Sequence, residues 1–353
     1  MSKIYQLRGS EIVEIDAFAA AVAAATINGL EEKFWREALP TPNKTEITIP
    51  KGLYVNIDGI VYTSVVDTTL QLSEVATADA RKGLDVYIYA CKPVTGSAPY
   101  FLLSMNSTVP DTYTAETSRK IGGFHCLSAD VGTIENHPLS DYVAGDILPA
   151  SVWDLLHRPY SEPEGMVYSE ELNLWCDIYL ASWDGSKLVS INGATTVDGT
   201  SAKPMHGEAF VENFAKVKKR LPFRNEFQVI AKGSNEGTAI NGAADAGSTG
   251  TGHVDTAGRR MISNIGCEDC CGFLWQWTGD IWNANGTTWT SINVAAIDGT
   301  GVTYGQMYGT LHRFIVGGAW DNAAKCGSRC VAGHHSSVVV HAAFGARGFA
   351  EPR

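Results

Sequence analysis

The sequence predicts an α+β protein with many loops and short strands, and three observations lead to this prediction. Its 353 residues include 36 glycines and many stretches rich in Asn, Asp, Thr and Ser, which favour turns over long helices. From Thr45 to about residue 128, apolar and polar residues alternate with a period of two, as in half-buried strands. Residues 11–27 instead form an Ala-rich stretch with apolar residues at helical spacing.

The N-terminal residues 1–44 are predicted to form a helical element. The Ala-rich stretch follows Ser10 and ends at Asn28-Gly29, a typical helix stop. An Ala-rich amphipathic element of this kind more often packs against another element than binds a ligand. We therefore expect residues 1–44 to serve oligomerisation or attachment.

Residues 45–128 are predicted to form a small antiparallel, β-sandwich-like domain. Asp58-Gly59 separates two alternating runs, 53–57 and 60–62, and this dipeptide is favoured in two-residue hairpin turns because both turn positions have positive φ. Two further alternating runs, 86–90 and 100–104, continue the pattern.

Residues 129–353 are expected to form a second domain rich in tryptophan and glycine. Large flat side chains fill a core where regular elements are scarce. Helices are expected over 211–220 and 225–231, and the Gly/Ala/Thr/Ser-rich stretch 233–258 is expected to be a long surface loop.

Composition excludes several classes of partner. A net charge of −11 at pH 7 repels a phosphate backbone, so no nucleic acid is expected. No segment has the roughly 18 uninterrupted apolar residues of a membrane helix, and the first residues lack the apolar core of a signal peptide. We therefore expect synthesis in a cytosol, no membrane insertion and reduced cysteines.

Three segments resemble the formylglycine-generating-enzyme branch of the C-type lectin fold. They are Arg220-Leu221-Pro222-Phe223-Arg224-Asn225-Glu226-Phe227, Gly272-Phe273-Leu274-Trp275-Gln276-Trp277, and Gly317-Gly318-Ala319-Trp320 with Gly327-Ser328-Arg329. Within this branch the chain resembles the variable proteins of diversity-generating retroelements. That likeness includes residues 119–125, Trp153-Asp154, Arg158-Pro159 and residues 344–348, covers roughly residues 45–350, and does not reach residues 1–44. Several motifs in the right order are a strong signal.

The resemblance implies a C-type lectin fold for residues 129–353, with a variable region at about 317–348. In this family an error-prone reverse transcriptase misreads template adenines, and the randomised positions lie on an exposed face that binds a receptor. The ligand-binding positions that it implies here are Ala319, Asp321, Ala323, Lys325, Ala332, His334, His335, Val339, His341 and Ala343. Asp, Ala, His and Val are reachable from an Asn codon by changing its first two bases. Lys325 is not, so it comes from an AAA or AAG template codon or is fixed. Arg329 and Arg347 are expected to pair with carboxylates or carbonyls beneath the face.

Metal and enzyme readings remain as alternatives. His334, His335 and His341 could bind a metal, but adjacent histidines do not readily face one ion and the run lacks a nearby carboxylate, so no metal is expected. Cys267, Cys270, Cys271, Cys326 and Cys330 could form a zinc site or remain buried thiols. Cys326 and Cys330 also suggest a copper oxidase of the formylglycine-generating type, although their spacing differs from that family's pair. The calcium-binding lectin motifs do not occur, and no cofactor is predicted.

The expected function is recognition without chemistry. The chain would bind a protein or glycan receptor on a cell surface, as a phage or prophage tail protein at the tip of a tail fibre, or as a cellular surface-recognition protein diversified in the same way. The face has few aromatic or arginine anchors. A homo-oligomer, first of all a trimer, would compensate through avidity.

Overall fold

The computed structural model describes residues 5–8, 11–14, 41–96, 98–242, 247–283, 286–293 and 303–353. The chain divides into two compact units. The first comprises residues up to 77 with 86–124 and 152–157, and the second comprises 78–85, 125–151 and 158–353. The chain thus passes between the units more than once, and neither unit is one continuous stretch.

The described part of the N-terminal segment is a hairpin and not a helix. Strands β1 (Tyr5–Arg8) and β2 (Glu11–Glu14) pair antiparallel, with Arg8 opposite Glu11. The helical prediction is therefore wrong for residues 11–14, because strand pairing outweighs the helical spacing there. The rest of the predicted helical element, residues 15–40, lies outside the described residues.

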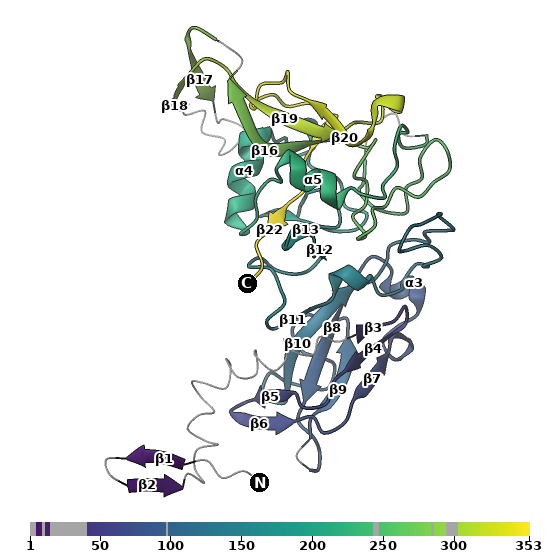
Figure 1. Ribbon diagram of the computed structural model, residues 1–353, viewed down its shortest axis with the longest axis vertical. Coiled ribbons are helices and arrows are strands. Elements are labelled where there is room, and N and C mark those ends of the chain that lie inside the picture. Colours follow the sequence, from purple (N-terminus) through teal and green to yellow (C-terminus); the bar gives the residue numbers. More distant parts are fainter. Residues whose placement is uncertain are drawn as a thin grey trace. The chain divides into compact units, whose positions relative to one another are not determined.

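The first unit also contains two small antiparallel sheets (Figure 1). One has the order β3-β4-β7, from Thr41–Pro42, Glu46–Ile49 and Thr68–Gln71. The other pairs β5 (Tyr54–Ile57) with β6 (Ile60–Thr63). Asp58 and Gly59 connect β5 and β6 with φ of 51° and 80°, so the predicted hairpin is confirmed.

The largest sheet of the first unit has the order β11-β10-β8-β9. Its strands are β8 (Asp85–Cys91), β9 (Tyr100–Ser104), β10 (Ser118–His125) and β11 (Trp153–Asp154). A Cβ on Gly122 would lie 2.6 Å from the Trp153 carbonyl oxygen, and one on Gly123 would lie 2.9 Å from the indole. These contacts explain the two adjacent glycines in β10, because only glycine lets Trp153 approach this closely.

The second unit is built from short strands and two longer helices. Three-stranded and two-stranded sheets have the orders β12-β13-β22 and β14-β15. Their bounds are β12 (Met166–Ser169), β13 (Leu174–Asp177), β22 (Phe349–Ala350), β14 (Ser182–Trp183) and β15 (Leu188–Val189). One-turn helices are α3 (Ala78–Arg81) and the 3₁₀ turns η2 (Pro149–Ser151) and η3 (Ala323–Lys325), with η1 (Leu72–Glu74) in the first unit.

Helix α4 (Gly207–Lys216) and helix α5 (Arg224–Ile230) confirm the two helices expected in this region, with shifted ends. At the start of α5, Glu226 accepts a hydrogen bond from the Phe223 amide and binds Arg220 at 2.8 Å. A Glu at the third helical position satisfies an amide that the helix itself leaves unpaired. The Arg-Leu-Pro motif therefore sets the start of this helix.

The sheet that carries the C-terminal motifs has the order β20-β19-β16-β21. Its strands are β16 (Trp275–Asn283), β19 (Leu311–Gly317), β20 (Gly327–Ala332) and β21 (Phe344–Gly345). A separate pair, β17 (Trp289–Asn293) and β18 (Thr303–Tyr308), connects β16 to β19. Figure 1 shows α4 and α5 beneath this sheet. The helices cover one side of the sheet, and its outer edge is formed by β20.

The loop over 233–258 has no helix or strand in its described residues, but it is not simply a surface loop. Asn235, Ala239, Thr249 and Asp255 are almost completely buried. Polar and small residues can be buried where their hydrogen bonds are satisfied. The surface part of the prediction is therefore wrong for these anchoring positions. Among the described residues, no helix is both long enough and apolar enough to cross a membrane.

Candidate functional site

The C-terminal motif begins with two glycines that the fold requires. Gly317 and Gly318 have φ of 90° and 83°, values that residues with a Cβ rarely adopt. A Cβ on Gly317 would lie 2.5 Å from the carbonyl oxygen of Cys270, and one on Gly318 would lie 2.8 Å from Cys326 Sγ. The chain therefore leaves β19 along a path that only glycine permits.

A compact turn over 319–326 follows. The Ala319 amide donates to Asn322 Oδ1 at 2.9 Å, and Cys326 Sγ donates to the Ala319 carbonyl oxygen at 3.3 Å. Asp321 and Lys325 are exposed on this turn. The backbone and Asn322 hold the turn together, so the exposed side chains do not have to.

Strand β20 lies at the edge of the sheet and alternates between half-buried and exposed side chains. Arg329 and Val331 are exposed, whereas Cys330 and Ala332 are half-buried. The Ser328 amide donates to the Glu236 carboxylate at 3.1 Å. Because side chains alternate along a strand, the edge strand β20 presents every second side chain to solvent.

Side chains of the sheet hold the next segment at its first residue. The Gly333 carbonyl oxygen accepts hydrogen bonds from Trp282 Nε1 at 2.9 Å and from His312 Nδ1 at 3.2 Å. Trp282 lies on β16 and His312 on β19. The variable-region candidates that follow are therefore positioned by two side chains of the central strands.

The same segment is held again near its end. His341 accepts a backbone hydrogen bond from Gly199 through its carbonyl oxygen and another from the Ala343 amide through Nδ1, both at 3.0 Å. Phe344 follows in β21 and is buried against Trp277, with ring centroids 5.4 Å apart. Between these two attachments His334 and Val340 are exposed, whereas Ser337 is completely buried.

The histidines of this segment lie together. The ring centroids of His334 and His335 are 3.9 Å apart, and those of His335 and His341 lie 4.7 and 4.9 Å from the Phe344 ring. Residues 334 and 335 lie outside any strand, so the alternation of a strand does not separate their rings. Burial, and then the neighbouring imidazoles His334, His341 and His312, lower the pKa of His335.

The ten predicted positions divide by exposure. Those exposed to solvent are Asp321, Ala323, Lys325, His334 and His341, and those half-buried are Ala332, His335 and Val339. Ala319 and Ala343 are 0% and 4% exposed, so their placement on an outer face is wrong. Ala319 forms a bridge with Phe273, and Ala343 precedes the buried Phe344.

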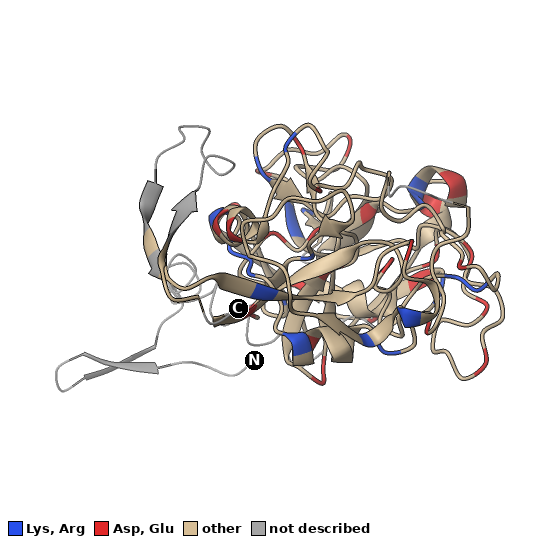
Figure 2. Cartoon of the chain, turned by 90° about the horizontal axis from the view of Figure 1, so that it is seen from above, with Lys and Arg blue, Asp and Glu red and all other residues tan. Residues whose placement is uncertain are grey.

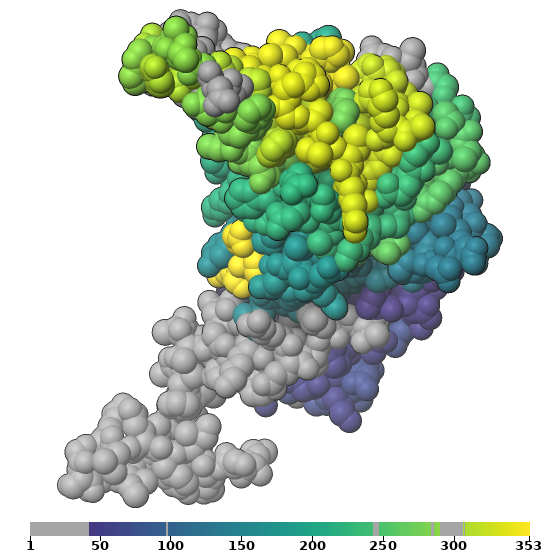
Figure 3. Space-filling model, turned by 45° about the horizontal axis from the view of Figure 1, so that its top comes forward, coloured from purple at the N-terminus to yellow at the C-terminus, as the bar shows by residue number. Residues whose placement is uncertain are grey.

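Four exposed residues of the same segment were not predicted. They are Ala324, Arg329, Val331 and Val340. The period of two in β20 could have indicated Arg329 and Val331. We call the exposed side chains of residues 321–341 the C-terminal face; it comprises Asp321, Ala323, Ala324, Lys325, Arg329, Val331, His334, Val340 and His341. Figure 3 shows most of the C-terminal residues, in yellow, over one broad area of the surface, with a smaller yellow patch apart from it.

Arg347 confirms one of the two expected arginine anchors. It is fully buried and donates to the carbonyl oxygens of Asp177, Ile178 and Glu268 and to Gln276 Oε1. Arg329, by contrast, is exposed, so its placement beneath the face is wrong.

Lys and Arg are interspersed with Asp and Glu over the described chain (Figure 2).

The cysteines are packed as thiols. Cys267, Cys270 and Cys271 are completely buried, and burial raises their pKa well above the usual range. Burial also raises the pKa of Cys326 to about 12 and raises that of Cys330. A reactive cysteine needs a lowered pKa, so this pair does not have the electrostatics of a nucleophile. Across the described residues, no group of three or more potential ligands is arranged to hold a metal.

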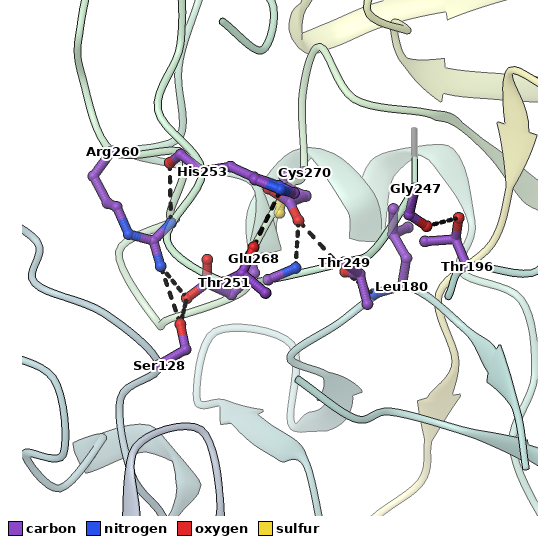
Figure 4. Close-up of polar contacts among 12 residues, drawn as sticks. Ser128, Leu180, Thr196, Gly247, Thr249, Thr251, His253, Arg260, Glu268 and Cys270 are labelled. Carbon is purple, nitrogen blue, oxygen red and sulfur yellow. Dashed lines mark hydrogen bonds and ion pairs between the residues drawn. The ribbon is translucent and has the colours of Figure 1, made fainter. Parts of the chain in front are cut away.

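A buried polar cluster was not predicted. Arg260 Nη2 lies 2.6 Å from Glu268 Oε1 and 3.2 Å from Ser128 Oγ, and Arg260 Nη1 donates to the His253 carbonyl oxygen (Figure 4). Burial raises the pKa of Glu268. The sequence separates Ser128 from Glu268 by 140 residues, so no local pattern signals it. The cluster is buried and holds the 233–258 loop against the rest of the second unit.

Comparison with known proteins relates this arrangement to one family. Residues 37–154 match the family model of the Mtd second domain. A tail fiber receptor-binding protein of Bordetella phage BPP-1 is 29% identical over 325 residues, which cover 85% of this chain and 78% of that protein. Structures of the U1 and M1 variants of the Major Tropism Determinant match with a TM-score of 0.72 and 26% identity, covering 88% of this chain and 81% of theirs.

These matches confirm the family resemblance seen in the sequence and establish a mostly β, C-type-lectin-like fold with few helices. Thus the α+β description holds only coarsely. In sequence and in fold, over most of its length, the chain is similar to the major tropism determinants.

Proposed function

We propose that this chain is the receptor-binding protein of a phage tail and that it binds its receptor through the C-terminal face. The observation that carries this proposal is the likeness, over 85% of the chain, to a tail fiber receptor-binding protein. The same likeness supports location in the virion tail and diversification by a retroelement. The receptor would be a protein or glycan on a cell surface.

The geometry supports this proposal because, apart from His341, whose Nδ1 accepts a hydrogen bond from the Ala343 amide, the exposed side chains of the face are not what holds the frame together. Its side chains project from a turn closed by Asn322, from an edge strand, and from a segment attached at Gly333 and His341. Exposed substitutions away from special contacts usually change stability by less than about 0.5 kcal/mol. Many different side chains are therefore compatible with one frame, as a diversified binding surface requires.

The expected trimer and the attachment role of residues 1–44 belong to this proposal. The face offers Arg329 and few aromatic side chains, so single-site binding would be weak. Linked sites gain roughly 10²- to 10⁴-fold in avidity. Sedimentation should give the mass of three chains, and a monomer at micromolar concentration would contradict this part.

Binding of the fluorescently labelled chain to a panel of bacterial strains tests the function. We expect selective binding to one or a few strains, and loss of that binding when Asp321, Lys325, His334 and His341 are replaced together by serine. A control with Glu74→Gln and Glu116→Gln, two exposed residues of the first unit, should bind like the unmodified chain. Equal binding by both variants would place the receptor site elsewhere.

A further inference from the structure

Four histidines from two parts of the second unit meet at one end of the C-terminal face. His334, His335 and His341 belong to the segment between Gly333 and Phe344, and His312 belongs to β19. His334 and His341 are exposed, whereas His312 and His335 are half-buried. The His312 ring lies 5.1 Å from that of Trp282. We call these four residues the histidine cluster.

The charged groups on the surrounding elements are already engaged. Arg313 of β19 binds Glu208 of α4 at 2.8 Å. Asp280 of β16 accepts a hydrogen bond from the Arg224 amide. In the loop joined to His341 through Gly199, Asp198 accepts hydrogen bonds from the Thr200 and Ser201 amides, and Lys203 lies over the Trp183 ring. The charges that act on His335 are the other three histidines of the cluster. Protonated imidazoles in this cluster therefore repel one another.

The histidine cluster gives this end of the C-terminal face four groups that can take up protons. Histidine is the side chain whose ordinary pKa, about 6.5, lies nearest to neutral pH. Burial and the neighbouring imidazoles lower the pKa of His335. His341 adds a structural consequence, because a proton on its Nδ1 displaces the hydrogen bond from the Ala343 amide.

The rest of the chain changes in the same direction. At neutral pH the net charge of −11 repels an acidic partner. Near the isoelectric point of about 5.3 this long-range repulsion disappears. Exposed Val340 and the partly exposed Trp282 beside the cluster suit the apolar parts of a polypeptide.

We propose, resting on the function proposed above, that the histidine cluster makes the C-terminal face a proton-gated site for an acidic peptide segment of the receptor. Imidazolium groups donate charge-assisted hydrogen bonds to carboxylates, and neutral imidazoles lose this advantage. Binding of an acidic segment strengthens as the pH falls through the range in which histidine titrates.

The test uses a rhodamine-labelled peptide in which glutamate alternates with glycine. Its binding is measured by fluorescence anisotropy at about pH 5.5 and about pH 7.5, on either side of the usual histidine pKa. Because exposed charge pairs each contribute modestly, we expect affinity about fivefold higher at the lower pH. A triple variant with His334→Gln, His335→Gln and His341→Gln should lose most of this gain. His157→Gln, outside the cluster in the first unit, should keep it.

Two further measurements make the outcome decisive. The triple variant should keep the circular dichroism spectrum of the unmodified chain, with a somewhat lower melting temperature because His341 accepts a hydrogen bond from the Ala343 amide. A peptide with glutamine in place of glutamate should bind equally weakly at both pH values. The same acid gain in the triple variant, or no binding of the glutamate peptide at about pH 5.5, would overturn the inference. Neither result affects the proposed function, which is tested by strain-selective cell binding.

Discussion

Arg347 Nη1 donates a hydrogen bond of 2.6 Å to the carbonyl oxygen of Asp177, 170 residues earlier in the chain. The guanidinium also binds the carbonyl oxygens of Ile178 and Glu268. One side chain thus joins the C-terminal motif to β13 and to the buried loop around Glu268. This completely buried arginine therefore joins three segments of the second unit.

Replacing Arg347 with methionine should destabilise the protein strongly. Several buried carbonyl oxygens would lose their donor, and the expected loss is about 3–5 kcal/mol in the free energy of unfolding. Urea denaturation measures it. The matched control is Arg329→Met, which alters an exposed arginine of the same segment and should cost less than about 0.5 kcal/mol. Similar losses in both variants would show that Arg347 is not the anchor.

Ala323 offers a stabilising substitution. Its φ of 46° lies in the left-handed region, which is unfavourable for residues with a Cβ but tolerated by asparagine. Ala323→Asn should raise the free energy of unfolding by roughly 0.5–1 kcal/mol. The exposed neighbour Ala324, which has no positive φ, provides the control in Ala324→Asn. An equal or lower melting temperature for Ala323→Asn would contradict the strain argument.

His253 should make stability depend on pH in a defined direction. Burial lowers its pKa, but the hydrogen bond with Asp269, at 3.0 Å, and the carboxylate's charge outweigh burial and raise it. The stabilisation is therefore fully present below the unfolded pKa of about 6.5 and is lost as the pH rises through the higher folded value. Between pH 6 and pH 8, the unmodified chain should lose on the order of 1 kcal/mol more than His253→Gln does.

His137 should make stability depend on pH in the opposite direction. Burial lowers its pKa, and its Nδ1 accepts a hydrogen bond from the Leu139 amide. Its stabilisation is present above the unfolded pKa and is lost as the pH falls through the lower folded value. As the pH falls, His137→Gln should therefore lose less stability than the unmodified chain does. An equal dependence of the free energy of unfolding on pH in His253→Gln and His137→Gln would contradict the two assignments.

Trp282 should control the order of the segment that follows Gly333. Trp282→Phe keeps an aromatic ring but removes the donor to the Gly333 carbonyl oxygen, at a cost of about 0.5–1.5 kcal/mol. Hydrogen exchange should speed up at residues 333–336 more than in β16. Trp289→Phe, at a tryptophan that is 64% exposed, is the control and should leave this exchange unchanged. Unchanged exchange in Trp282→Phe would mean that His312 alone holds the segment.

The sequence by itself determined the features that depend on local geometry. The Asp58-Gly59 hairpin, helices α4 and α5 and the paired glycines at 317–318 follow from positive φ, helical spacing and capping chemistry, which neighbouring residues express directly. The order of its motifs was also sufficient to indicate the family. In the N-terminal segment, strand pairing prevailed over helical spacing at residues 11–14.

Tertiary structure alone decided which parts of the C-terminal segment face outward. Ala319 and Ala343 are buried, while Ala323 and Ala324 are exposed; an alanine carries no local sign of its burial, which depends on distant residues such as Phe273. The meeting of four histidines and the contact of Arg260 with Ser128 are likewise set by how separate parts of the chain pack. Burial and long-range contact are properties of the packed chain, and neighbouring residues do not encode them.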